Sequence, residues 1–290
     1  MKNPLFAGVC TALVTPFLLD KVNYPMMDML LQRQLDAGIT TVVVAGTTGE
    51  APTLSDSEKL ALIHRAKCYT GNACTIIAGT GSNCTRHAVD LSIEAEDAGA
   101  DALLVVSPYY NKATPDGLIA HYMAIAHSVS IPIILYNVPS RTGVDIPVSV
   151  YRRLSAIPNI AGVKEASTDI TKITRIRAEC PEDFAVWSGN DDQITPAMSL
   201  GAKGVVSVLS NLCPTEAQAM VQAAIAGDFD TAAALQTKLL PLIELLFCQV
   251  NPIPIKEAMA LVGYDCGGCR LPLTKLTLEN REKLMEYLEK

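Results

Sequence analysis

The sequence is poor in aromatic residues and in charge, and it lacks any block of basic side chains. Aromatic residues make up 5% of the 290 positions and charged residues 18%, and the formal net charge is -7. No run of Lys and Arg reverses this balance locally. We therefore expect no nucleic-acid partner and no anionic-membrane partner, because both select a basic surface.

The sequence also lacks an uninterrupted apolar stretch long enough to cross a bilayer, although 49% of its residues are hydrophobic. Residues 1–19 are apolar, but Pro4 and Pro16 interrupt them. The charged pair Asp20 and Lys21 follows, where a signal peptide would need small residues for cleavage. We expect a soluble, cytoplasmic protein with a large buried core.

The nine cysteines lack the spacing of a disulfide framework or of a complete metal site. Cys266 and Cys269 form a C-x-x-C motif around two glycines, but no second pair and no nearby His completes a zinc site. We expect no metal, and mostly buried thiols that behave as small apolar groups. Any further role of this pair stays open.

Short β-branched runs alternate with amphipathic stretches as far as about residue 210. The strands we predict are Gly8–Val14, Thr41–Ala45, Thr75–Gly79, Ala102–Val106, Ile133–Asn137, Ile160–Lys164, Ala185–Trp187 and Gly204–Ser207. The helices between them include Met26–Ala37, Ser57–Tyr69, Thr85–Ala98 and Thr114–Ser128. These strands are apolar throughout, as expected when both faces are covered. The pattern predicts an α/β fold of the (β/α)8 TIM-barrel type, whereas a doubly wound sheet would need a glycine-rich loop after the first strand.

Helix boundaries are marked by polar residues at one end and glycines at the other. Caps are expected from Ser55 and Ser57 before one helix, from Thr85 at another and from Asp169 at a third. The helix-ending glycines are Gly38, Gly99 and Gly201.

Strand signals stop after Leu209, and the remaining chain has helical spacing interrupted by glycine and proline. The sequence therefore predicts two domains. Residues 1–212 form the catalytic barrel, and residues 213–290 form a small C-terminal helical domain that serves as scaffold and in assembly.

Active sites of such barrels lie at the carboxyl ends of the strands. That rule selects the side chains at these ends as candidates: Thr47, Thr48, Tyr109, Tyr110, Tyr136, Lys164, Ser188–Asp191 and Val206–Ser207.

Lys164 is the most informative candidate, because it ends an apolar run that should be buried. Side chains alternate along a strand, so Ile160, Gly162 and Lys164 should share one side and Glu165 should lie on the other. If the first side faces the barrel axis, Gly162 leaves an empty space beneath the amine. Burial favours the neutral amine, which is the nucleophilic form. Glu165 is then structural.

The same alternation places Tyr136 with Ile134, and Thr47 with Val43 and Ala45. A Schiff-base aldolase needs a lysine, a group that moves protons and donors for the substrate carboxylate. Tyr136 supplies a phenol, and the glycine-flanked turn around Thr47 supplies backbone N–H groups.

Arg141 lies just past the fifth predicted strand, at the expected catalytic end of the barrel. A bidentate guanidinium at this place suits a second carboxylate.

These residues belong to a set of short motifs that resembles the dihydrodipicolinate synthase family of pyruvate-dependent class I aldolases over essentially the whole chain. Each motif alone is weak, but their order and spacing are specific. The motifs are Thr11–Phe17, Gly46–Glu50, Pro108–Asn111, Tyr136–Gly143, Gly162–Glu165, Ser188–Asp191 and Arg270–Leu273.

The resemblance implies a reaction and roles. Pyruvate forms an imine on Lys164 and its enamine attacks aspartate semialdehyde, which gives 4-hydroxy-tetrahydrodipicolinate in the first committed step of lysine and diaminopimelate biosynthesis. Tyr136 donates and accepts protons, linked through Thr47 to Tyr110 of a neighbouring subunit. No metal or organic cofactor is implied.

The resemblance also implies binding residues and an assembly. Thr48 and the backbone of Val206 would hold pyruvate, and Arg141 and Gly189 would lie near the second substrate. A homotetramer is implied, a dimer of dimers with Tyr109 and Tyr110 at the tight interface.

Two other functions stay open. One is a lyase for N-acetylneuraminate or another 2-keto-3-deoxy sugar acid, although such lyases carry Ser where Thr47 stands and lack the element Ser140–Gly143. The other is a non-catalytic barrel with a binding role.

Feedback control is expected to be weak or absent. At the positions of the family's lysine site this chain has Asp56, Lys59 and His87. Lys59 would repel the ammonium group of an inhibitory lysine.

Overall fold

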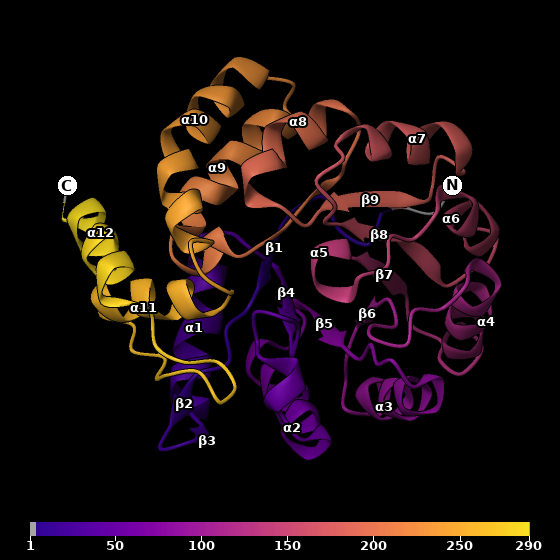
Figure 1. Cartoon of the computed structure of the whole chain (residues 1–290), viewed down its shortest axis with the longest axis horizontal. Coiled ribbons are helices and arrows are strands. Elements are labelled where there is room, and N and C mark those ends of the chain that lie inside the picture. Colours follow the sequence, from indigo (N-terminus) through magenta and orange to yellow (C-terminus); the bar gives the residue numbers. More distant parts are fainter. Residues whose placement is uncertain (1–3, 290) are drawn as a thin grey trace.

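The computed structural model describes residues 4–289, so residues 1–3 and 290, at the ends of the two predicted domains, lie outside it. Eight parallel strands close into a barrel in the order β1-β10-β9-β8-β7-β6-β5-β4 (Figure 1). The predicted (β/α)8 barrel is confirmed, and only the carboxyl ends of some strands differ from the prediction. The strands are β1 (Gly8–Ala12), β4 (Thr41–Val44), β5 (Thr75–Gly79), β6 (Ala102–Val106), β7 (Ile133–Asn137), β8 (Ile160–Glu165), β9 (Ala185–Ser188) and β10 (Gly204–Ser207).

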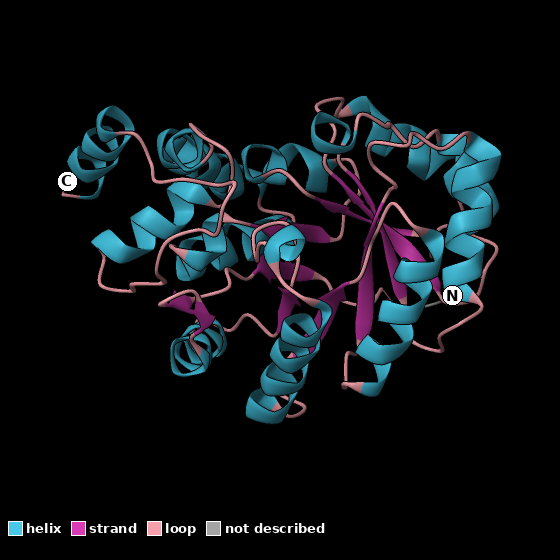
Figure 2. Cartoon of the chain, turned by 60° about the horizontal axis from the view of Figure 1, so that its bottom comes forward, coloured by secondary structure: helices cyan, strands magenta, loops and turns pink. Residues whose placement is uncertain are grey.

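Helices surround this barrel and extend to one side of it (Figures 1 and 2). Those that follow the barrel strands are α1 (Tyr24–Asp36), α2 (Asp56–Thr70), α3 (Thr85–Asp97), α4 (Pro115–Ala126), α5 (Pro139–Thr142), α6 (Val148–Leu154), α7 (Thr171–Glu179), α8 (Ile194–Ser199) and α9 (Pro214–Ile225). Three short 3-10 turns cover Ala51–Thr53, Asp191–Gln193 and Leu209–Asn211. A hairpin that the sequence did not suggest, β2 (Phe17–Leu18) with β3 (Lys21–Val22), lies between β1 and α1.

The C-terminal region adds α10 (Phe229–Leu246), α11 (Ile253–Leu261) and α12 (Leu278–Leu288) beside the barrel (Figure 1). The expected helical character after Leu209 is confirmed. α9 packs against β1 and α8, and α10 packs against α9. A domain boundary between residues 212 and 213 stays a prediction. Across residues 4–289, each helix is too short or too polar to span a bilayer.

The predicted glycines Gly38, Gly99 and Gly201 each follow a helix end with a positive φ, but of the predicted N-terminal caps only Ser55 holds. Ser55 caps α2 in a capping box, since its hydroxyl accepts from the Glu58 N–H while the Glu58 carboxylate accepts from the Ser55 N–H. Thr85 is instead the first residue of α3, and its hydroxyl pairs with Nδ1 of His121 at 2.9 Å. Asp169 precedes α7 and accepts the Thr171 N–H at 3.0 Å, one residue before the cap position.

The apolar side chains form two cores that the barrel wall separates. The outer core fills the space between strands and helices and continues under the C-terminal helices. The inner core lies inside the barrel and includes Cys10, Val43, Ile77, Leu104, Ile134, Tyr136, Trp187 and Val206. The Trp187 ring stacks on Phe6 at 4.7 Å between centroids, and its N–H donates to the Phe6 carbonyl. The barrel is therefore a packed body whose open end is its carboxyl end.

Candidate active site

Lys164 and Tyr136 face each other within the barrel. β7 and β8 are in register so that Tyr136 pairs with Lys164. The Lys164 amine lies 4.3 Å from the centroid of the Tyr136 ring, and both side chains are buried. Parallel pairing thus brings one amine and one phenol together at adjacent strand ends.

The predicted alternation along β8 is wrong at Ile160. A register shift sets Ile133 opposite Ile160 but Ile134 opposite Gly162, so β8 carries one extra residue. Ile160 therefore packs in the outer core. The expected empty space at Gly162 is wrong too. A Cβ there would lie 2.0 Å from the Ala185 carbonyl oxygen, so the backbone of β9 occupies the space.

Glu165 points away from the barrel axis, as predicted. Its carboxylate accepts from the Asn137 amide at 2.7 Å, from the Ser167 N–H at 2.9 Å and from the Tyr151 hydroxyl at 3.2 Å. Lys172 of α7 lies 3.7 Å from it. Burial and then the Glu165 charge raise the pKa of Tyr151, which keeps its hydroxyl protonated as a donor. This network ties the ends of β7 and β8 to the helical layer.

Thr47 and Thr48 lie in the turn that follows β4. The strand ends at Val44, and Ala45 has a positive φ of 53° and packs in the outer core. The predicted common face of Val43, Ala45 and Thr47 is therefore wrong at Ala45, because the left-handed residue breaks the alternation. Thr47 nevertheless lines the cavity at the barrel mouth. Thr48 is buried, and its hydroxyl accepts from the Asn251 amide at 3.0 Å.

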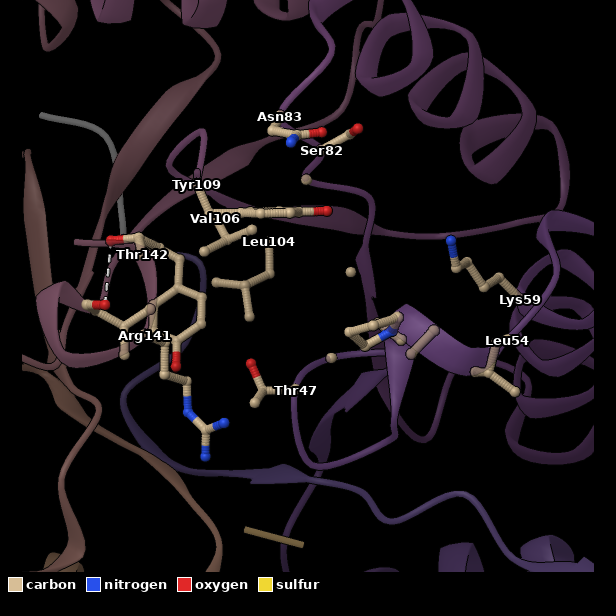
Figure 3. Close-up of a pocket in the computed structure, with 18 of the residues that line it drawn as sticks. Thr47, Leu54, Lys59, Ser82, Asn83, Leu104, Val106, Tyr109, Arg141 and Thr142 are labelled. Atoms are coloured by element: carbon tan, nitrogen blue, oxygen red, sulfur yellow. Dashed lines mark hydrogen bonds between the residues drawn. The ribbon is translucent and has the colours of Figure 1, made fainter. Parts of the chain in front are cut away.

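A cavity of about 610 Å³ opens at the carboxyl ends of the strands. Thr47, Tyr136, Arg141 and Tyr109 all line it. In Figure 3 the Arg141 guanidinium and the Thr47 hydroxyl face into this space, while Lys59 lies at the opposite side of the view. The size suits a small organic molecule.

The cavity extends to a polar cluster on α2 and α3. Asp56 binds the Lys59 amine at 3.0 Å and Nε2 of His87 at 2.8 Å, and Nδ1 of His87 meets the Ser82 hydroxyl. Burial raises the pKa of Asp56, but the hydrogen bonds and charges of Lys59 and His87 together outweigh it, so the pKa lies below its ordinary value. Both carboxylate oxygens of Asp56 are therefore engaged.

The remaining predicted site residues differ in placement. A Cβ on Gly189 would lie 2.6 Å from the Ala166 Cβ and 3.0 Å from Cε of Lys164, so any side chain there would force Ala166 to shift. Val206 belongs to the inner core on β10. Tyr110 has a positive φ of 70° and is 92% exposed, whereas the neighbouring Tyr109 lines the cavity. Within this chain, Tyr110 does not join the other site residues.

One buried polar residue at the site, Asn251, was missed by sequence reasoning, whereas Asp191 lies in the predicted candidate segment Ser188–Asp191. Asn251 connects the Thr48 hydroxyl to Arg141, whose Nη2 donates to the Asn251 carbonyl at 3.3 Å. Asp191 is fully enclosed, and its Oδ2 accepts the N–H groups of Val208 and Leu209, each at 2.9 Å. Burial raises the pKa of Asp191, which the surrounding donors and then Lys164 oppose. The only signal for Asn251 was the Asn-Pro break before α11.

Cys266 and Cys269 carry free thiols. Burial raises the pKa of each to about 12, so both are protonated near neutral pH and are poor nucleophiles. Among residues 4–289, no group of three His, Cys, Asp or Glu side chains is placed to hold a metal ion.

A (β/α)8 barrel with a buried lysine beside a tyrosine at the carboxyl ends of its strands has the architecture of a class I aldolase-type lyase. The sequence model of the dihydrodipicolinate synthetase family matches residues 5–290. The chain belongs to this family, and it is a lyase of the class I aldolase type.

Individual relatives are similar to this chain along nearly its whole length. A 4-hydroxy-tetrahydrodipicolinate synthase of Caldicellulosiruptor saccharolyticus is 47% identical over 98% of this chain and 97% of its own. The crystal structure of dihydrodipicolinate synthase from Aquifex aeolicus is 42% identical, with a TM-score of 0.96 over 98% of this chain and 97% of its own. A structure described as a monomeric dihydrodipicolinate synthase variant is 37% identical, with a TM-score of 0.96 over 98% and 96%.

Proposed function

We propose that this protein condenses pyruvate with L-aspartate 4-semialdehyde to 4-hydroxy-tetrahydrodipicolinate, in lysine and diaminopimelate biosynthesis, through an imine on Lys164. The observation that carries the proposal is the buried amine held 4.3 Å from the Tyr136 ring in a barrel of this family. The neutral form of this amine is the nucleophile that attacks the keto carbon of pyruvate.

The imine is the electron sink of the reaction, so no cofactor is needed. The Lys164 nitrogen bonds to the keto carbon and water leaves. The methyl group of bound pyruvate then loses a proton to give an enamine, whose carbon attacks the aldehyde. The amino group of the semialdehyde finally attacks the imine carbon, which closes the ring and releases the Lys164 amine. Tyr136 is the proton carrier, linked through Thr47 to Tyr110 of a neighbouring subunit. Thr48 and the backbone of Val206 hold the pyruvate carboxylate.

Arg141 and Gly189 would receive the second substrate. Aspartate semialdehyde brings its own carboxylate, and the Arg141 guanidinium lines the cavity while its Nη2 is anchored on the Asn251 carbonyl. A charge-assisted bond to a fixed guanidinium favours this aldehyde over an uncharged sugar chain. This feature favours the synthase over a sugar-acid lyase.

Trapping the imine tests the proposal. The protein is incubated with pyruvate, reduced with borohydride and weighed by mass spectrometry, with Lys164→Ala as the matched control. We expect an adduct on Lys164 only in the unaltered chain. If the unaltered chain forms no adduct, the result would support the alternative of a non-catalytic barrel with a binding role. Turnover with aspartate semialdehyde against sugar aldehydes then separates synthase from lyase.

Assembly and organisation belong to the same proposal. We expect a cytoplasmic homotetramer, a dimer of dimers with Tyr109 and Tyr110 at the tight interface. The strong exposure of Tyr110 within one chain supports a contact there, although one relative is described as a monomeric variant. The catalytic barrel would comprise residues 1–212 and the C-terminal helical domain residues 213–290.

A further inference from the structure

A buried ion pair connects the turn that follows β4 to the C-terminal region. Glu50 ends the turn Gly46–Glu50, and its side chain is fully buried. One carboxylate oxygen accepts from the Lys256 amine of α11 at 2.8 Å. The other accepts from the Arg270 N–H at 2.8 Å. Two separate points of the C-terminal region therefore hold the same carboxylate.

The partner amine is equally well satisfied. Lys256 is 3% exposed, donates also to the Gly268 carbonyl at 2.9 Å and lies 4.4 Å above the centroid of the Phe17 ring. A buried ion pair adds little net stability, because desolvating two charges offsets their attraction. It does fix one geometry, since moving either group would leave a buried charge without its partner. The pair is thus better suited to fix a local backbone conformation than to stabilise the fold.

The shape that it holds is the turn carrying Thr47 and Thr48. Glu50 has a positive φ of 58°, which is uncommon for a residue with a side chain. Its N–H donates to the Thr47 carbonyl, and the Ala51 N–H donates to the Gly46 carbonyl, each at 3.1 Å. An anchored carboxylate keeps Glu50 in this conformation, and these hydrogen bonds transmit its position to Thr47.

We infer that Glu50 and Lys256 are positioning residues that hold the Thr47–Thr48 turn in its catalytic geometry. The inference rests on the proposed function, in which Thr48 binds the pyruvate carboxylate and Thr47 relays protons. Loosening the turn should therefore affect pyruvate binding and turnover. The semialdehyde should be less affected, because Arg141 comes from α5 and not from the turn Gly46–Glu50.

The test compares three variants in the full-length protein. Lys256→Met leaves the Glu50 carboxylate buried without a counter-charge and should lower the melting temperature. Glu50→Leu/Lys256→Met removes both charges at similar volume, which separates geometry from the cost of an unpaired charge. Glu257→Gln is the matched control, because Glu257 is the next residue of α11 but pairs with Arg281 of α12 at 2.6 Å.

We expect the double variant to fold and to form the pyruvate adduct on Lys164. Its KM for pyruvate should rise about tenfold and its kcat should fall about tenfold, because small misplacements of positioning groups have effects of this order. Its KM for the semialdehyde should stay within about twofold of the unaltered chain, and Glu257→Gln should change none of these constants. If the double variant does not fold, Glu50→Gln, which keeps the side-chain shape, should raise the KM for pyruvate about threefold.

Two results would overturn the inference. One is a folded double variant (or, in its place, a folded Glu50→Gln variant) with unchanged KM for pyruvate and unchanged kcat. The other is an equal loss of kcat/KM for both substrates that also occurs in Glu257→Gln. That result would indicate a merely structural role. Failure of the proposed function is distinct from both, because the unaltered chain would then form no adduct with pyruvate.

Discussion

At the scale of single residues, the pairing of Tyr136 with Lys164 separates two chemical tasks. In the proposed mechanism, the amine forms the bond to pyruvate and the phenol moves protons. Tyr136→Phe keeps the ring that lies 4.3 Å from the amine but removes the hydroxyl. We expect kcat to fall by roughly 10²- to 10⁴-fold, the usual range for a lost acid–base group. The adduct on Lys164 should still form after borohydride, and its loss would contradict this division of tasks.

In the proposed function, Arg141 selects the aldehyde that is accepted. Arg141→Ala removes a charged hydrogen-bond donor worth about 1.5–3 kcal/mol, so KM for the semialdehyde should rise roughly 10- to 150-fold. KM for pyruvate should change little, because its carboxylate is assigned to Thr48 and Val206. Initial rates with each substrate varied in turn provide the measurement. Arg152→Ala, at an exposed arginine of α6, is the control, and equal losses for both substrates would argue against the role.

At the scale of helices and strands, the first turn of α2 contains a pH-sensitive contact. Glu58 lies 2.6 Å from Nη2 of Arg270, and this contact is the main cause that lowers its pKa to about 2. A carboxyl whose pKa falls on folding stabilises the native state fully above its ordinary value near 4.5. That contribution is lost as the pH falls from about 4.5 toward about 2.

Glu58→Gln should therefore lower the urea midpoint at neutral pH and flatten its decline between about pH 4.5 and 2.5. Because both side chains are partly exposed, the change should be modest. Glu279→Gln offers a matched control, as its carboxylate pairs with Lys283 on the exposed face of α12. If the urea midpoint of Glu58→Gln declines as steeply with falling pH as that of the unaltered chain, the Glu58 carboxylate does not contribute to the pH dependence of stability.

The cluster between α2 and α3 governs the expected response to lysine. From the family resemblance, we expect the inhibitor site to correspond by position to Asp56, Lys59 and His87. Both Asp56 oxygens are already bound by the other two side chains, and the Lys59 amine would repel a second ammonium group. Initial rates should be unchanged by sub-millimolar lysine. Strong inhibition in that range would show that the cluster opens to admit the ligand.

The elements themselves were predictable from local patterns, because apolar runs and glycine signals act over a few residues. The side to which individual residues point was less predictable. An extra residue in β8 moved Ile160 to the outer core, and a left-handed Ala45 broke the alternation before Thr47. Neither irregularity leaves a periodic signal, so alternation located Lys164 correctly and its neighbours only in part.

At the scale of the whole molecule, the contacts around the site join distant parts of the chain. Asn251 reaches Thr48, and Lys256 reaches Glu50, although the partners lie at opposite ends of the sequence. Only tertiary packing creates such pairs, and a lone Asn or Lys in a helical region reads as a surface group. The sequence assigned the C-terminal region to scaffold and assembly. These contacts make it a support of the candidate site, because it holds residues that lie at or beside the cavity.

The proposed dimer makes the site a property of two chains, and this can be tested by mixing inactive variants. Tyr110 is 92% exposed and does not line the cavity of its own chain. If its hydroxyl serves the neighbouring site, Tyr110→Phe and Lys164→Ala should each have low activity alone. In a mixed dimer, however, the Lys164→Ala chain would supply an intact tyrosine to the intact lysine of its partner.

The two variants are unfolded and refolded together in equal amounts. Random pairing makes about half of the two-fold dimers hybrids, and one of the two sites in each hybrid is complete. About a quarter of all sites in the sample are then complete. We therefore expect activity to recover toward about a quarter of the unaltered level. Refolding each variant alone is the control. If Tyr110 acted within its own chain, no hybrid would contain a complete site, because each chain would still lack one of the two groups. Mixing would then restore nothing, and the shared-site proposal would be wrong.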